Sequence, residues 1–258
     1  GELLRVMYPA PDFRNWIDEF VTGVKINDSG MIYLHDDINN QYHQYYTENT
    51  NILHTEITNT YFNLSIKQTD FALLKNSVLV KKYELENKNS IDLNVNFLVH
   101  AKLLSDVNNM VGSEIRENAL IQYCHDYCLY TFSKMPFMSY QLNDTKENIG
   151  SGVIQDKDYI GMSCDSSISY DMGILKPGEK KELVLYLYFK IIGEKQTEES
   201  IKKELTEIRK LDVQKEEQAV EKYWKKYVKE HLGIELKPET SKFNKKFNQV
   251  YQRSILLF

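Results

Sequence analysis

The residue types best suited to chemistry lie together in one short segment, Cys124-His125-Asp126-Tyr127-Cys128. Thiolates and imidazoles are the ligands that zinc prefers, but a structural zinc site needs four of them, usually from two such clusters. The sequence has one cluster. In a strand, Cys124, Asp126 and Cys128 would share one face and His125 would point to the other. We therefore expect buried or half-buried strand cysteines, with no metal site and no cofactor.

Two acidic segments are the other candidates for acid and base chemistry. In His35-Asp36-Asp37 the adjacent carboxylates would point to opposite sides of an extended chain, and Asn39-Asn40 indicates a solvated turn. Asp156 and Asp158 would lie on one face of a strand, roughly 6.5 Å apart by Cα. A glycosidase needs two carboxyl groups that flank the scissile bond, so this pair is a candidate. The alternating acidic and basic residues around them are more typical of an exposed connection. Gly150-Ser151-Gly152 lacks the spacing of a nucleophile elbow. We expect no catalytic residue in this sequence.

The composition narrows the classes of partner. The 258 residues carry a net charge of −5 with acidic and basic residues well mixed, which argues against binding to nucleic acid or to an anionic membrane surface. No apolar run approaches the roughly 20 residues of a membrane helix. Three cysteines, Cys124, Cys128 and Cys164, are too few for a disulfide framework. This set fits a reducing compartment, so we expect a cytoplasmic protein rather than a secreted one.

The sequence begins without Met inside an apolar segment and stops at Ile255-Leu256-Leu257-Phe258 in the middle of a helical pattern. The last turn of a helix needs partners for its carbonyl groups and a cover for its apolar face. We expect a piece of a longer polypeptide.

Exposed aromatic residues are the third kind of candidate, because aromatic faces stack on sugar rings as well as on one another. Two prolines stiffen the segment Tyr8 to Asp18, which suits a loop that contacts another domain or a sugar. The alternatives are an ordinary loop between strands and tyrosines that pack within a sheet. The candidate residues of this kind are Tyr8, Asp12, Arg14, Trp16, Asp18 and Tyr45.

The stretch from Leu175 to Ile192 separates two kinds of sequence, β-structure before it and helices after it. Pro177-Gly178 predicts a turn, and from Glu182 the side chains alternate as in a strand. Both faces of this strand are apolar or aromatic, so we expect it to be covered on both sides. The chain before it has short alternating runs separated by turn signals, which is typical of an antiparallel sandwich.

Two strand pairs are predicted within the sandwich. Val24 and Ile26 lead through Asn27-Asp28-Ser29-Gly30 to Ile32 and Leu34. Val78 to Glu86 leads through Asn87 to Ser90 into Ile91 to His100, and we expect these two runs to form a hairpin. In the second run, odd-numbered positions are apolar and Asp92, Asn94, Asn96 and His100 face the other way, which predicts one packed and one wet face.

Helical patterns follow. Thr197 is expected to cap the first helix, Asp212 to interrupt or re-cap it, and Gly233 to end it. After Pro238, Thr240 or Ser241 is expected to cap one more helix. The linker helix carries a packing face that includes Tyr223, Trp224 and Tyr227.

These parts in this order resemble the front of bacterial family 15 glycoside hydrolases, which include glucoamylases and glucodextranases. The residues that carry the resemblance are Leu175 to Glu179 with the strand after it, Tyr223-Trp224-Lys225-Lys226-Tyr227, Tyr251-Gln252-Arg253-Ser254-Ile255-Leu256-Leu257, and near the front Met7-Tyr8-Pro9, Asp12 and Thr22-Gly23-Val24.

The resemblance implies a mainly β fold. It consists of an antiparallel, mutarotase-like β-supersandwich at 1–192, a helical linker at 193–236, and the first helix of a truncated (α/α)6 toroid at 237–258. It also implies that every catalytic residue lies in the toroid, beyond Phe258. The sequence would then be a non-catalytic structural domain of a glucoamylase-like, exo-acting, inverting α-glucosidase. Its partners would be its own catalytic domain and, through the parent enzyme, an α-glucan or maltooligosaccharide. Two alternatives stay open, a carbohydrate-binding module and the N-domain of an inverting disaccharide phosphorylase.

Overall fold

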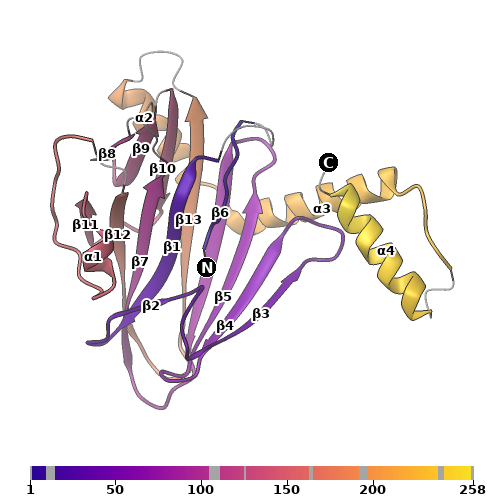
Figure 1. Ribbon diagram of the computed structural model, residues 1–258, viewed down its shortest axis with the longest axis horizontal. Coiled ribbons are helices and arrows are strands. Elements are labelled where there is room, and N and C mark those ends of the chain that lie inside the picture. The colour runs from indigo at the N-terminus through magenta and orange to yellow at the C-terminus, as the bar shows by residue number, and fades with distance from the viewer. Residues whose placement is uncertain are drawn as a thin grey trace.

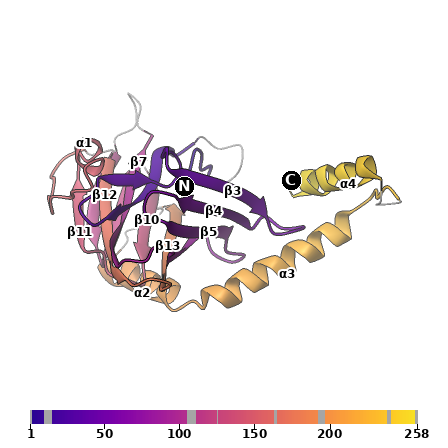
Figure 2. The ribbon, with the colours of Figure 1, turned by 90° about the horizontal axis from the view of Figure 1, so that it is seen from below.

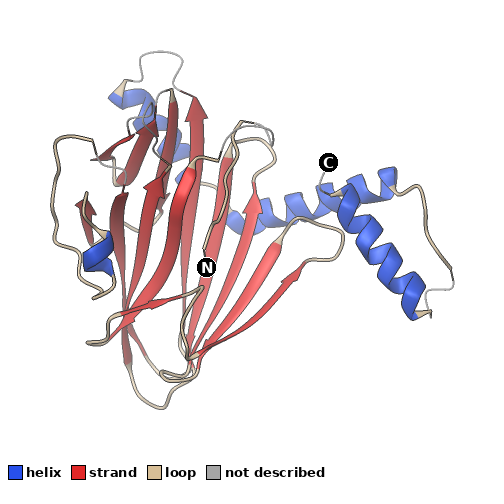
Figure 3. Ribbon diagram, in the orientation of Figure 1, coloured by secondary structure: helices blue, strands red, loops and turns tan. Residues whose placement is uncertain are grey.

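The computed structural model describes residues 2–9, 15–104, 111–124, 126–162, 165–191, 197–237 and 241–256. Within them, two antiparallel sheets pack face to face and helices follow at the end of the chain (Figures 1 and 3). The mainly β, antiparallel sandwich predicted from the sequence is confirmed. The small sheet has the order β11 (Ser139–Leu142), β12 (Asp165–Leu175), β7 (Leu93–Leu103), β1 (Ile17–Ile26), β2 (Met31–Tyr33). The large sheet has the order β3 (Asn40–Tyr46), β4 (Leu53–Asn59), β5 (Leu64–Ala72), β6 (Val78–Asn87), β13 (Lys180–Ile191), β10 (Tyr127–Ser133), β9 (Ala119–Cys124), β8 (Val111–Arg116).

Alternation along the strands builds the core between the sheets. Leu93, Val95, Phe97 and Val99 of β7 are fully buried, and the Phe97 ring lies 4.6 Å from that of Tyr83 on the facing sheet, centroid to centroid. Each such side chain contributes about 1.5 to 3 kcal/mol when it leaves water. The sandwich is therefore stabilised mainly by this shared apolar layer.

The hairpin around residues 24–34 forms as predicted. In it β1 pairs with β2 in the register Val24↔Ile32. Asn27, in the turn, has a φ of 52°, a left-handed conformation that asparagine tolerates better than most residues.

The hairpin predicted for the runs 78–86 and 91–100 is wrong. Strand β6 belongs to the large sheet and β7 to the small one, so the link between them is an arch from one sheet to the other. The Asn87 side chain holds this arch by donating hydrogen bonds to the carbonyl oxygens of Ile91 and Leu175, both at 2.8 Å. The wet face predicted for β7 is also only partly wet, because Leu98 and His100 are buried on it.

The strand predicted between Leu175 and Ile192 is β13, and it lies in the middle of the large sheet between β6 and β10. Leu183, Leu185 and Leu187 pack into the core between the sheets, whereas Val184 and Tyr186 pack on the opposite face against the helices. The strand is covered on both sides, as its apolar faces predicted.

The helices are α1 (Lys146–Ile149), α2 (Glu198–Arg209), α3 (Val213–His231) and α4 (Lys242–Ile255). Thr197, Asp212 and Ser241 cap the last three through their side chains. Helix α2 lies against the outer face of the large sheet, α3 runs outward, and α4 turns back beside it (Figure 2). Among the described residues, none of the helices has the length and apolarity needed to cross a membrane.

Candidate functional site

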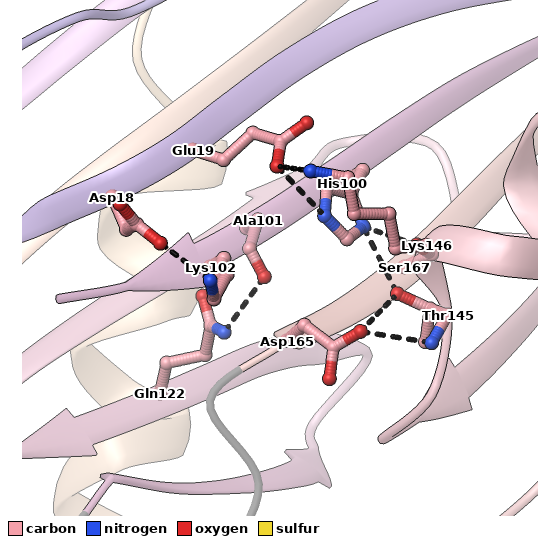
Figure 4. Close-up of polar contacts among 10 residues, drawn as sticks. All are labelled: Asp18, Glu19, His100, Ala101, Lys102, Gln122, Thr145, Lys146, Asp165 and Ser167. Atoms are coloured by element: carbon pink, nitrogen blue, oxygen red, sulfur yellow. Dashed lines mark hydrogen bonds and ion pairs between the residues drawn. The ribbon is translucent and has the colours of Figure 1, made fainter. Parts of the chain in front are cut away.

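A cluster of catalytic residue types surrounds His100 on the outer face of the small sheet (Figure 4). The imidazole Nδ1 lies 2.9 Å from Thr145 Oγ1 and 3.1 Å from Ser167 Oγ. Its Nε2 lies 4.0 Å from Glu19 Oε2. This cluster was not predicted from the sequence. Thr145, Ser167 and Glu19 are 45, 67 and 81 residues from His100 along the chain, so no local spacing indicates that they meet.

A hydroxyl, an imidazole and a carboxylate in this order match a catalytic triad, in which the hydroxyl is the nucleophile, the imidazole the base and the carboxylate the group that orients the imidazole. The surroundings exclude that role, since His100, Thr145 and Ser167 are each at most 1% exposed and no substrate can reach the hydroxyls. The Thr145 hydroxyl also donates a hydrogen bond to Asp165 Oδ2 at 3.2 Å.

The electrostatics of the cluster favour a neutral imidazole. Burial lowers the pKa of His100, although the nearby Glu19 and Asp165 carboxylates oppose that shift. Glu19 Oε2 also accepts a 2.9 Å ion-paired hydrogen bond from Lys146 Nζ. The cluster therefore fastens α1 to the sheet and does no accessible chemistry.

The cysteines of the 124–128 segment lie in a hairpin. Cys124 ends β9 and packs in the core between the sheets, whereas Cys128 on β10 packs on the opposite face beneath the helices. The expectation that they share a face is wrong, because the chain reverses between them. Burial raises the pKa of the Cys128 thiol to about 12, so it is a poor metal ligand. His125 and Cys164 lie outside the described residues. Within the described ranges, His, Cys, Asp and Glu side chains form no group of three that could hold a metal.

The two acidic segments lie in exposed connections, as expected. Asp156 Oδ1 accepts a 3.1 Å hydrogen bond from the Tyr140 backbone N–H, and Asp158 Oδ1 accepts one of 2.9 Å from the Tyr140 hydroxyl. Asp37 Oδ1 accepts a hydrogen bond from the Asn39 N–H in the bend between β2 and β3. These contacts stabilise turns and do not bring a pair of carboxylates together across a cleft.

Trp16 and Tyr8, from the segment near the front, pack against the sandwich. Trp16 is 6% exposed, its indole N–H donates to the Tyr8 carbonyl oxygen at 2.8 Å, and its ring lies 4.2 Å from that of Tyr127. The half-buried Tyr8 ring lies 5.8 Å from Phe189. Exposed Asp18 forms an ion pair with Lys102. Asp12 and Arg14 lie outside the described residues. Trp16 therefore serves packing within the chain.

Tyr45 lies elsewhere, on the edge strand β3. Its hydroxyl donates to Glu56 Oε1 at 3.0 Å and its ring stacks on His54 at 5.0 Å. Ile57 of β4 packs into the core between the sheets, and His54, three residues before it, points to the opposite face. Tyr45 is paired with His54 and lies on that opposite face too. The structure therefore does not gather Tyr45 and Trp16 into one surface.

Helix α3 touches the sandwich along one side. Val220 and Val228 are buried, and Trp224 packs against the cluster between the large sheet and the helices. Glu217 Oε2 of this helix forms an ion pair with Lys82 Nζ on β6 at 2.6 Å. Tyr223 is exposed and stacks with Tyr227 at 6.2 Å. Of the predicted packing face, Trp224 makes the main contact with the sandwich.

Helix α4 meets the sandwich at the turn between β3 and β4. The Arg253 guanidinium lies 3.4 Å from the centroid of the Tyr46 ring and donates to the Thr50 carbonyl oxygen at 3.0 Å. The Asn51 amide in turn donates to the Leu256 carbonyl oxygen at 3.0 Å. A groove of about 690 Å³ opens at this junction.

The other side of α4 is apolar and exposed. Phe243 is 71% and Val250 62% exposed, and Phe243, Phe247 and Tyr251 form a stack of rings along the helix. Exposed apolar surface of this kind is typical of an interaction site. This side of α4 is the candidate inter-domain surface of the chain.

No family model and no curated protein matches this sequence. Solved structures do match. A bacterial glucoamylase complexed with acarbose is 16% identical with a TM-score of 0.73, over 100% of this chain and 37% of its own. A protein assigned as kojibiose phosphorylase, from the human microbiome, is 12% identical with a TM-score of 0.67, over 99% of this chain and 34% of its own. The chain thus spans about a third of the length of each. At these identities the likeness establishes the fold, which resembles the glucoamylase N-domain.

Proposed function

We propose that this chain is a non-catalytic accessory domain of a carbohydrate-active enzyme, and that it holds a helical catalytic domain in place. The observation that carries the proposal is the position of α4. Arg253 and Asn51 fix it against the sandwich while Phe243 and Val250 remain exposed on its other side. A helix fixed on one side and apolar on the other is suited to be the first helix of an (α/α)6 toroid.

The parent enzyme under this proposal is a glucoamylase-like, exo-acting, inverting α-glucosidase that binds an α-glucan or a maltooligosaccharide in its toroid. The fold shared with bacterial glucoamylase supports it. The second candidate is the N-domain of an inverting disaccharide phosphorylase, which the shared fold of the kojibiose phosphorylase structure supports. Under either candidate we expect the catalytic residues to lie outside residues 1–258.

An activity assay tests the non-catalytic role. Residues 1–258 are incubated with maltose and maltooligosaccharides, with and without inorganic phosphate, and released glucose and glucose 1-phosphate are measured. We expect neither product above the buffer control. Clear turnover by the purified chain would overturn the proposal. A stop codon directly after Phe258 in the gene would also overturn it. A downstream toroid with two catalytic carboxylates would favour the hydrolase, and one with a phosphate site would favour the phosphorylase.

A second experiment tests the attachment of α4. Arg253→Ala removes the contact with Tyr46 and the hydrogen bond to the Thr50 carbonyl. We expect amide hydrogen exchange to accelerate in α4 and to stay unchanged in the strands. Lys246→Ala, an exposed position on the same helix, is the matched control and should change nothing. Equal protection of α4 in the Arg253→Ala and control variants would show that these contacts do not hold the helix.

A further inference from the structure

The short helix α1 and the residues after it cover the outer face of the small sheet. Ile149 is buried against Met31 and Leu98 in a small apolar cluster separate from the two main ones. The Met31 N–H donates to the Gly150 carbonyl oxygen at 3.1 Å. We call residues 145–152 the α1 segment. Because its apolar attachment is small, its hold on the sheet depends strongly on polar contacts.

Those polar contacts converge on His100. The Thr145 N–H donates to Asp165 Oδ2 at 2.8 Å, and the Thr145 hydroxyl lies between Asp165 and the imidazole. Lys146 at the other end of the cluster pairs with Glu19. The α1 segment therefore covers His100 and is bound through it.

Only one of the two nitrogens of the neutral imidazole is hydrogen-bonded to a described residue. Nδ1 has two hydroxyl partners, whereas the buried Nε2 makes no hydrogen bond with any described residue. A buried polar atom in this position is costly. The charged groups that act on the ring are Glu19 of β1, Asp165 of β12, Lys146 of α1, and Lys102 of β7 with its partner Asp18. Tyr33 of β2 interacts with Glu19 and Lys146.

We propose that the α1 segment is a proton-controlled latch, which opens from the small sheet at mildly acidic pH when His100 takes up a proton, while the two sheets stay paired. The closed segment keeps water from the ring, and a buried imidazolium lacks the hydration that the open segment would give it. The carboxylates of Glu19 and Asp165 attract the proton, but each already has another partner, Lys146 for Glu19 and Thr145 for Asp165.

The direction of the effect follows from proton linkage. Burial lowers the pKa of His100 in the closed form, so the open form binds the proton more tightly. Opening is therefore suppressed above the ordinary histidine pKa of about 6.5. Below it, the opening equilibrium rises by up to about tenfold per pH unit until the pKa of the closed form is reached.

Amide hydrogen exchange of the full chain between pH 7.5 and 5 tests the latch, with rates corrected for the intrinsic pH dependence of exchange. In the wild type we expect amides of residues 145–152 to lose protection by up to about tenfold per pH unit below pH 6.5. Amides of α2 serve as the internal reference and should not change. His100→Asn keeps an amide group near the Nδ1 position but cannot titrate, so its α1 segment should show no pH dependence.

The matched control is His43→Asn, which removes an exposed histidine of β3. Its α1 segment should respond to pH as the wild type does. The proposal fails if the wild-type segment is insensitive to pH, if His100→Asn keeps the response, or if His43→Asn loses it. If His100→Asn does not fold, NMR titration of the wild-type imidazole decides. A midpoint below 6.5 that coincides with opening of the segment supports the latch, and an ordinary midpoint overturns it.

Discussion

Asp70 on β5 and Lys81 on β6 form a buried ion pair whose two members are unequally protected. The Lys81 ammonium lies 3.0 Å from Asp70 Oδ1, and its side chain is completely buried, whereas that of Asp70 is 14% exposed. Asp70 Oδ2 also accepts a 2.6 Å hydrogen bond from Gln68. The lysine thus depends on the carboxylate for its charge compensation more than the carboxylate depends on the lysine.

Asp70→Asn keeps the shape of the side chain but leaves the ammonium buried and uncompensated, which costs about 3 to 5 kcal/mol. This is a large part of a typical folding stability of roughly 5 to 15 kcal/mol. Lys81→Met leaves a carboxylate that keeps Gln68 and some solvent, so we expect the smaller loss of about 1 to 3 kcal/mol. The double variant buries no unpaired charge and should recover most of the loss of Asp70→Asn.

Urea unfolding followed by circular dichroism measures these differences. Glu84→Gln, which breaks the exposed pair with Lys180, is the matched control and should leave the midpoint unchanged. The reasoning is refuted if Asp70→Asn lies within about 1 kcal/mol of the wild type, or if Lys81→Met is the more damaging of the two single changes.

Three further predictions concern the core. Phe97→Asp places a charge in the layer between the sheets and should abolish cooperative unfolding; a soluble variant with a sharp melting transition would contradict the packing described. Burial raises the pKa of Tyr186 and Tyr188 to about 12, so the stability they contribute is complete below about pH 10 and is lost as the pH rises toward 12. Tyrosinate absorbance should therefore rise together with unfolding, and ionisation of every tyrosine near pH 10 in the folded chain would refute this. Iodoacetamide at pH 8 should leave the buried Cys124 and Cys128 unmodified until urea is added, as peptide mass spectrometry would show.

Features that depend on neighbouring residues could be predicted from the sequence. The side chains of Thr197, Asp212 and Ser241 cap their helices because a cap needs only the first turn that follows it. Alternation along β7 and β13 predicted which residues meet the core, because the side-chain period of a strand is local.

Features that depend on distant residues could not be predicted. The link from Asn87 to Ser90 has the length and composition of a hairpin, but it is an arch because β6 and β7 pair with strands of different sheets. The Asn87 side chain holds the arch partly through the Leu175 carbonyl, 88 residues away. The burial of His100 depends on the α1 segment in the same way. Both cases involve partners brought together by topology, which residue spacing does not record.

The central position of β13 has a consequence for how the protein is made. This strand is the last of the sandwich to be synthesised, yet it lies between β6 and β10. Until residue 191 has left the ribosome, the large sheet is in two pieces, each with an unpaired edge toward the gap. Such edges pair readily with other chains. The nascent chain is therefore most prone to aggregate just before β13 emerges, and the interval before that strand is where a chaperone would be most useful.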